Sequence, residues 1–168
     1  MAEYEISESR KQFLLDNFVE YSFEQDDEGN DLEADKSVFD SISSPEELFY
    51  LAQICNWDDG AIIPKWIIES PLCTKATALT IFWQSAPDEY MEYEFGSQVP
   101  GWKGGIDEEQ TEILNILEKL VSRFKYDDYL NKDIAFDFSV WGGKIVVKDP
   151  KWSVNDVFFQ NLDGTVVV

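Results

Sequence analysis

The chain has 168 residues and a formal net charge of −21, with 44% hydrophobic and 15% aromatic residues. This length and apolar content predict a single folded domain, residues 1–168, with a substantial core. The negative charge argues against partners that are themselves negative, namely a nucleic-acid backbone or an anionic membrane surface. It favours encounter with a basic protein instead.

The N-terminal sequence MAEYEISESR is acidic and lacks the basic and apolar regions of a signal peptide. The uncharged run from Ala76 to Pro87 is shorter than the roughly 18 apolar residues that a transmembrane helix needs. We therefore expect a cytoplasmic protein. Residues 7–21 predict an amphipathic helix capped by Ser7, because Leu14 and Phe18 recur at helical spacing.

Residues 24–40 are rich in acids and poor in apolar side chains, which predicts a mobile acidic loop. An EF-hand calcium site does not fit this loop, because Gly29 stands at the fourth position from Asp26 and the motif needs glycine at the sixth. We predict no metal site. The loop carboxylates are instead candidates for steering a basic partner: Asp26, Asp27, Glu28, Asp31, Glu33 and Asp35.

Residues 44–87 predict a central unit of three short helices. Ser44 is an N-cap, Pro45 suits the first helical position, and Glu47 stands at the capping-box position. Turn residues then end this helix, and further helices follow over residues 61–69 and from Thr74 to about residue 86. Three short helices have to bury their faces against one another and against the flanking segments.

Residues 107–125 predict a long amphipathic helix, with Asp107 as its cap and basic residues near its end. Residues 130–168 predict a β-rich segment, since Ile134, Phe136, Phe138 and Val140 alternate with smaller or polar residues. A hairpin would turn at the two glycines that follow, and a final strand would occupy residues 165–168. The expected fold is thus mainly α, a compact multi-helix domain with a small C-terminal β hairpin, and α+β overall.

The sequence contains no histidine, which excludes a Ser-His-Asp triad, a Cys-His pair and His-ligated metals. Carboxylate chemistry remains, through the pairs Asp58–Asp59 or Asp127–Asp128. Adjacent residues rarely converge on one substrate, so we predict no enzyme activity and no cofactor. Cys55 and Cys73 are expected to be buried thiols.

The blocks NWDDG (residues 56–60), IPKWII (63–68) and TALTIFW (77–83) resemble a bacterial family of uncharacterised domains, the DUF4274 type. The resemblance covers about a quarter of the chain directly. It implies a compact helical domain and supplies no catalytic residues. Members occur in bacteria, and some look like accessory or immunity-type proteins encoded near toxin genes.

Three hypotheses follow. The first is a small acidic binding protein that neutralises a basic partner, such as an immunity protein that occludes a cationic toxin. The second is a non-catalytic scaffold or regulatory domain whose acidity is only solubilising, and the third is a hydrolase that uses carboxylates or a metal. We favour the first, with contact made by Trp57, Asp58, Asp59 and Trp66 and steering by the acidic loop.

Overall fold

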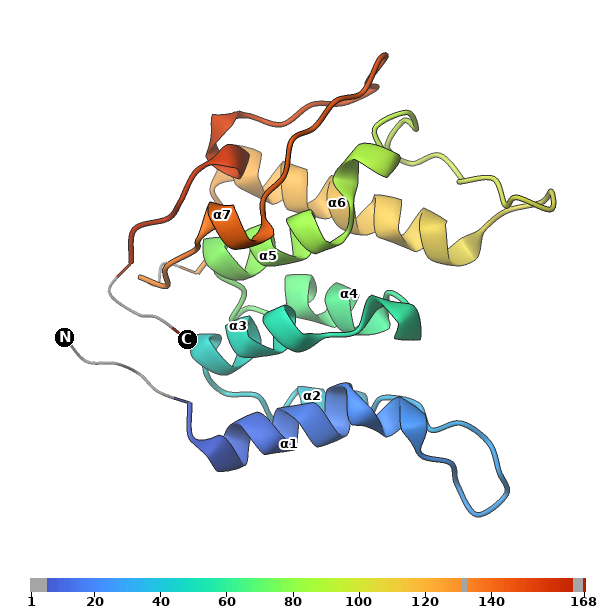
Figure 1. The fold of residues 1–168 in the computed structure, drawn as a ribbon, viewed down its shortest axis with the longest axis vertical. Coiled ribbons are helices and arrows are strands. Elements are labelled where there is room, and N and C mark those ends of the chain that lie inside the picture. The colour runs from blue at the N-terminus through green and yellow to red at the C-terminus, as the bar shows by residue number, and fades with distance from the viewer. Residues whose placement is uncertain (1–5, 131–132, 165–167) are drawn as a thin grey trace.

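The structure, a computed structural model, describes residues 6–130, 133–164 and 168. Its helices are α1 (Glu8–Phe18), α2 (Lys36–Phe39), α3 (Pro45–Ile54), α4 (Ile62–Glu69), α5 (Lys75–Gln84), α6 (Glu108–Tyr126) and α7 (Phe138–Trp141). Short 3-10 turns are η1 (Glu20–Phe23), η2 (Trp57–Asp59), η3 (Pro87–Glu89) and η4 (Asp156–Phe159). Figure 1 shows α1 and α2 at one end, α3 and α4 in the middle, and α5, α6 and α7 beyond them.

Helix α5 forms the centre of the core. Its residues from Ala76 to Trp83 are all buried, and α3, α4, α6 and α7 pack against it. The hydroxyl of Thr80 is satisfied within the helix, because it donates to the carbonyl of Ala76 at 2.9 Å. A helix that is buried on every side needs neighbours on every side, and this need sets the layered arrangement. Among the described residues, none of the helices is both long and apolar enough to cross a bilayer.

The predicted helix starts are confirmed. The side chains of Ser7, Ser44, Thr74 and Asp107 each accept a hydrogen bond from the backbone N–H three residues further on. These bonds satisfy donors that a helix cannot pair internally at its first turn. Local sequence therefore determines where α1, α3, α5 and α6 begin.

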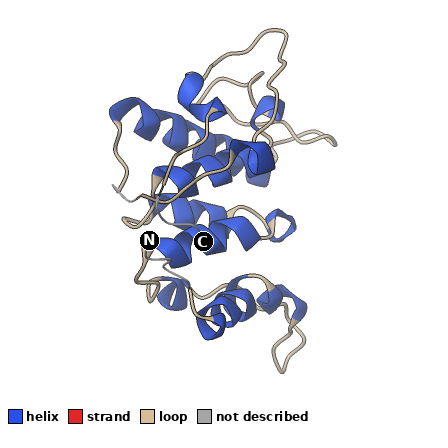
Figure 2. Cartoon of the chain, turned by 60° about the vertical axis from the view of Figure 1, so that its left-hand side comes forward, coloured by secondary structure: helices blue, strands red, loops and turns tan. Residues whose placement is uncertain are grey.

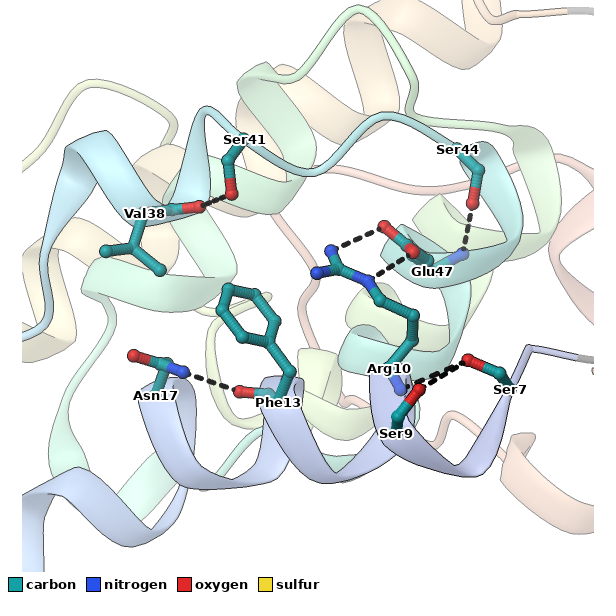
Figure 3. A network of polar contacts seen from close by, with 9 residues as sticks. All are labelled: Ser7, Ser9, Arg10, Phe13, Asn17, Val38, Ser41, Ser44 and Glu47. Atoms are coloured by element: carbon teal, nitrogen blue, oxygen red, sulfur yellow. Dashed lines mark hydrogen bonds and ion pairs between the residues drawn. The ribbon is translucent and has the colours of Figure 1, made fainter.

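The backbone N–H of Glu47 donates to the Ser44 cap, but its side chain bonds to α1 rather than closing the predicted capping box. Its carboxylate accepts hydrogen bonds from Nε and Nη2 of Arg10, at 2.7 and 3.1 Å, as Figure 3 shows. The hydrogen bond to Glu47 raises the pKa of the Arg10 guanidinium. The side chain of Glu47 is 11% exposed and that of Arg10 is 35% exposed, so a partly buried, charge-assisted ion pair links α1 to α3.

The predicted C-terminal β hairpin, and with it the α+β class, is wrong. Within residues 6–130, 133–164 and 168 the structure contains helices, turns and isolated β-bridges, with no strand (Figure 2). The alternating pattern breaks at Asp137, whose carboxylate accepts from the backbone N–H of Ser139 at 2.9 Å and starts α7. Phe136 pairs with Leu162 in one bridge rather than in a hairpin. The strand predicted for residues 165–168 lies mostly outside the described residues.

The segment after α7 covers α5 and α6 instead of pairing with itself. The indole N–H of Trp83 donates to the carbonyl of Phe158 at 2.8 Å. The Phe158 ring packs against Phe82 and Phe124, each with its ring centroid 4.5 Å away. Large aromatic side chains therefore fix this segment through contacts distant in the sequence, which a local pattern does not reveal.

We expect Arg10→Met to lower the free energy of unfolding by about 1–3 kcal/mol, because the poorly hydrated Glu47 carboxylate loses its partner while the aliphatic stem is kept. Lys151→Met is the matched control, since it removes an exposed ion pair with Asp149 of little consequence for stability. Urea unfolding measures both variants. Equal shifts in the midpoint would show that the Arg10–Glu47 pair is not a structural link.

Gly164→Ala should also destabilise the protein, by about 1–3 kcal/mol, through overpacking. A Cβ atom at Gly164 would lie 2.4 Å from the backbone nitrogen of Ala135 and 2.5 Å from the carbonyl oxygen of Asp133. Gly143→Ala is the control, because its Cβ would meet Trp83 at an ordinary 3.7 Å. Thermal unfolding that leaves both variants equal to the wild type would contradict the close packing of residues 133–164.

Candidate functional site

The predicted acidic loop, from here on the acidic segment (residues 24–35), folds into a turn followed by an extended stretch. The carboxylate of Asp26 accepts from the backbone N–H groups of Glu28 and Asn30, both at 2.9 Å, and hydrogen bonds led by the Asn30 side chain lower its pKa. An isolated bridge between Gln25 and Asp31 closes the turn. Asp26, with its exposed neighbours Asp27 and Glu28, thus belongs to the turn at the tip of this segment.

The predicted loop over residues 24–40 is too long, because its last residues form α2. Asp35 is the N-cap of this helix and accepts from the backbone N–H of Ser37 at 2.8 Å. Hydrogen bonds led by the Ser37 hydroxyl lower the pKa of Asp35. Asp35 therefore has a local structural role in addition to its charge.

A groove of about 570 Å³ lies between the acidic segment and α4. It brings together four of the residues singled out in the sequence, from three separate stretches: Asp31, Glu33, Asp59 and Trp66. The other residues that line it are Tyr21, Ser22, Leu32, Ala34 and Ile62. We call this the acidic groove.

The acidic groove carries negative charge that no ion pair within residues 6–130, 133–164 and 168 neutralises. Asp59 accepts hydrogen bonds from Ser22 and Asn56, each at 3.1 Å, and Asp31 accepts from Gln25 at 3.1 Å. None of the ion pairs among the described residues involves Asp31, Glu33 or Asp59. Hydrogen bonds from neutral side chains thus orient Asp31 and Asp59.

Tyr21 is influenced by carboxylates from both sides of the groove. Its pKa is raised first by burial and then by the charges of Asp59 and Glu33, which belong to η2 and to the acidic segment. Both carboxylates therefore act on one phenol hydroxyl. The field in the groove disfavours further negative charge and favours a cation.

The acidic groove also has an apolar surface. Ile62 and Trp66 are four residues apart on α4 and share one face, while Ile63 and Ile67 are buried in the core. Ile62 is 42% exposed and Leu32 is 37% exposed. Sequence reasoning missed Ile62, Leu32 and Tyr21. The spacing of Ile62 and Trp66 was a signal for a second, outward apolar face.

Trp57 and Asp58 lie outside the groove. The indole N–H of Trp57 donates to the side-chain oxygen of Gln84 at 3.1 Å, and its ring packs against the core. Asp58 is exposed, and its backbone N–H donates to the Asn56 side chain at 3.1 Å. Trp57 and Asp58 therefore do not line the groove, whereas Asp59 and Trp66 do.

Both thiols are buried in the core. Burial raises the pKa of Cys55 and of Cys73 to about 12, so both are protonated thiols at neutral pH. Among the described residues, no group of three or more carboxylates and cysteines is arranged to hold a metal ion. The chemistry that the acidic groove offers is recognition of positive charge beside an apolar surface.

Comparison with known protein families finds a match to one family model. Residues 43–125 match the model of the family described as "Domain of unknown function (DUF4274)". No curated protein and no solved structure matches the chain. The matched stretch runs from just before α3 to the last turn of α6 and contains the NWDDG, IPKWII and TALTIFW blocks. It includes Asp59, Ile62 and Trp66 from one wall of the groove. Residues 43–125 of this chain are thus similar to the DUF4274 family, an uncharacterised domain family.

Proposed function

We propose that this protein is a small, non-enzymatic binding protein that captures a basic protein through the acidic groove. One observation carries the proposal: Asp31, Glu33 and Asp59 converge beside Trp66, and none of the described lining residues is a lysine or arginine. A cationic side chain that entered the groove would meet carboxylates and an aromatic ring together. Both interactions favour a cation, and charge-assisted hydrogen bonds are the stronger of the two.

The charge of the whole chain supports the same partner. A net charge of −21 creates a field that speeds encounter with a basic surface, most strongly at low ionic strength. The exposed acids of the turn, Asp26, Asp27 and Glu28, extend this field beyond the groove. Steering by the turn and contact in the groove are separate contributions to binding.

An immunity-type role fits these features best. In that role the protein would occlude a cationic toxin, such as a nuclease, in the cytoplasm of the cell that makes it. Such a toxin has a basic surface because its substrate is a polyanion. Capture requires no catalytic group from this chain, only a stable and complementary surface.

The triple variant Asp31→Asn/Glu33→Gln/Asp59→Asn should lose at least about 90% of the basic protein that the wild type retains from a lysate of its own organism. This variant removes the three carboxylates that the groove offers to a cation, and truncating one partner of a charge pair that binding buries costs more than removing a rim charge. Retained proteins are quantified by mass spectrometry after a low-salt wash.

The control is Asp88→Asn/Glu89→Gln/Glu92→Gln, which removes three exposed carboxylates from η3 and the loop after it. Both triple variants change the net charge by the same amount. The control should retain the basic protein with only a modestly slower association rate. Equal losses in the two variants would mean that total charge matters and the groove does not.

A further inference from the structure

A second hollow follows the acidic groove along α4. It has a volume of about 390 Å³ and is lined by Lys36, Phe39, Asp40, Ile42, Trp66 and residues 69–72. Trp66 lines both hollows. Ile62, Trp66 and Glu69 are spaced by four and three residues, so one face of α4 passes from the first hollow to the second.

The two hollows differ in charge. In the second, Lys36 forms an ion pair with Asp40, and Glu69 forms one with Lys119. The Lys36 ammonium lies 5.6 Å from the centroid of the Trp66 ring. The second hollow thus already contains a cation beside Trp66 and an acid, whereas the first has the acids and the ring without a cation of its own.

The second hollow is suited to an apolar side chain. Phe39 and Ile42 are buried beneath it, and the Trp66 ring is tilted against Phe39 with centroids 5.5 Å apart. Because its charged groups are paired with each other, an incoming cation would gain little there and would be repelled by Lys36. An apolar group would cover the half-buried Trp66 and Leu72 and the exposed Pro71 without leaving a charge unpaired.

We propose that the partner binds as an elongated segment along α4, with a cationic side chain in the acidic groove and an apolar side chain in the second hollow. This inference rests on the proposed function and specifies the kind of segment that is recognised. Helix α4 rises about 10 Å from Ile62 to Glu69, which an extended chain spans in about three residues. The cationic and apolar residues of the partner are therefore about three positions apart, on either side of Trp66.

Three synthetic peptides test the arrangement: Gly-Arg-Gly-Gly-Leu-Gly, its Leu→Gly analogue and its Arg→Gln analogue. Each is titrated into the full chain, and binding is followed by NMR through the Trp66 indole N–H and the methyl groups of Ile62 and Leu72. Ile62 reports on the acidic groove, and Leu72 reports on the second hollow. Trp66→Phe assigns the indole signal.

The parent peptide should shift all three signals and bind about tenfold more tightly than either analogue. The Leu→Gly analogue should shift Ile62 and leave Leu72 unmoved. The variant Asp31→Asn/Glu33→Gln/Asp59→Asn should bind the parent and the Arg→Gln analogue equally. The groove of this variant lacks the three carboxylates that bind the arginine in the wild type.

Two outcomes overturn the inference in distinguishable ways. If the Leu→Gly analogue binds as tightly as the parent, and Ile62 responds to arginine while Leu72 does not, the second hollow plays no part and the proposed function stands. If none of the peptides moves Ile62 or Trp66, the acidic groove does not bind cations and both proposals fail.

Discussion

The burial of α5 is the constraint on which the rest of the structure depends. From Ala76 to Trp83 this helix has no side that faces water, so each neighbouring element is positioned by the surface it covers. Trp83 adds a polar requirement, because a buried indole N–H needs an acceptor. The carbonyl of Phe158 provides it, which brings the C-terminal segment across the core rather than into a hairpin.

The sequence predicts well those features, such as helix starts, that residues close together in the chain determine. A serine, threonine or aspartate that can accept from the third following N–H defines a helix start without help from the rest of the chain, and Ser44 and Asp107 illustrate this. The C-terminal segment is decided by distant contacts. Its alternating apolar residues match a strand, yet Asp137 starts a helical turn, and Phe158 packs on α5 and α6. Periodicity gives no information about such contacts.

The acidic groove combines residues that the sequence indicates with an arrangement that only distant contacts determine. The sequence indicated the acids and Trp66 as separate features, and it could not show that Asp31, Glu33 and Asp59 converge, because they lie on segments with different folds. Trp57 had the same appearance in the sequence as Trp66, and both pack against the core. Trp57 does not line the groove, and its indole N–H donates to Gln84. An aromatic residue beside acids therefore becomes informative only when its exposed face is known.

The two walls of the groove are under unequal constraint. On α4, Ile63 and Ile67, which directly follow Ile62 and Trp66, are core residues, so that wall cannot change shape without disturbing the fold. Residues 31–33 of the opposite wall are exposed and lie outside the part of the chain that matches the family. Substitutions of these exposed residues alter the groove with little effect on the free energy of unfolding. Under the proposed binding function, mutations in this short stretch would change which partner is recognised, while the helical domain behind it stays the same.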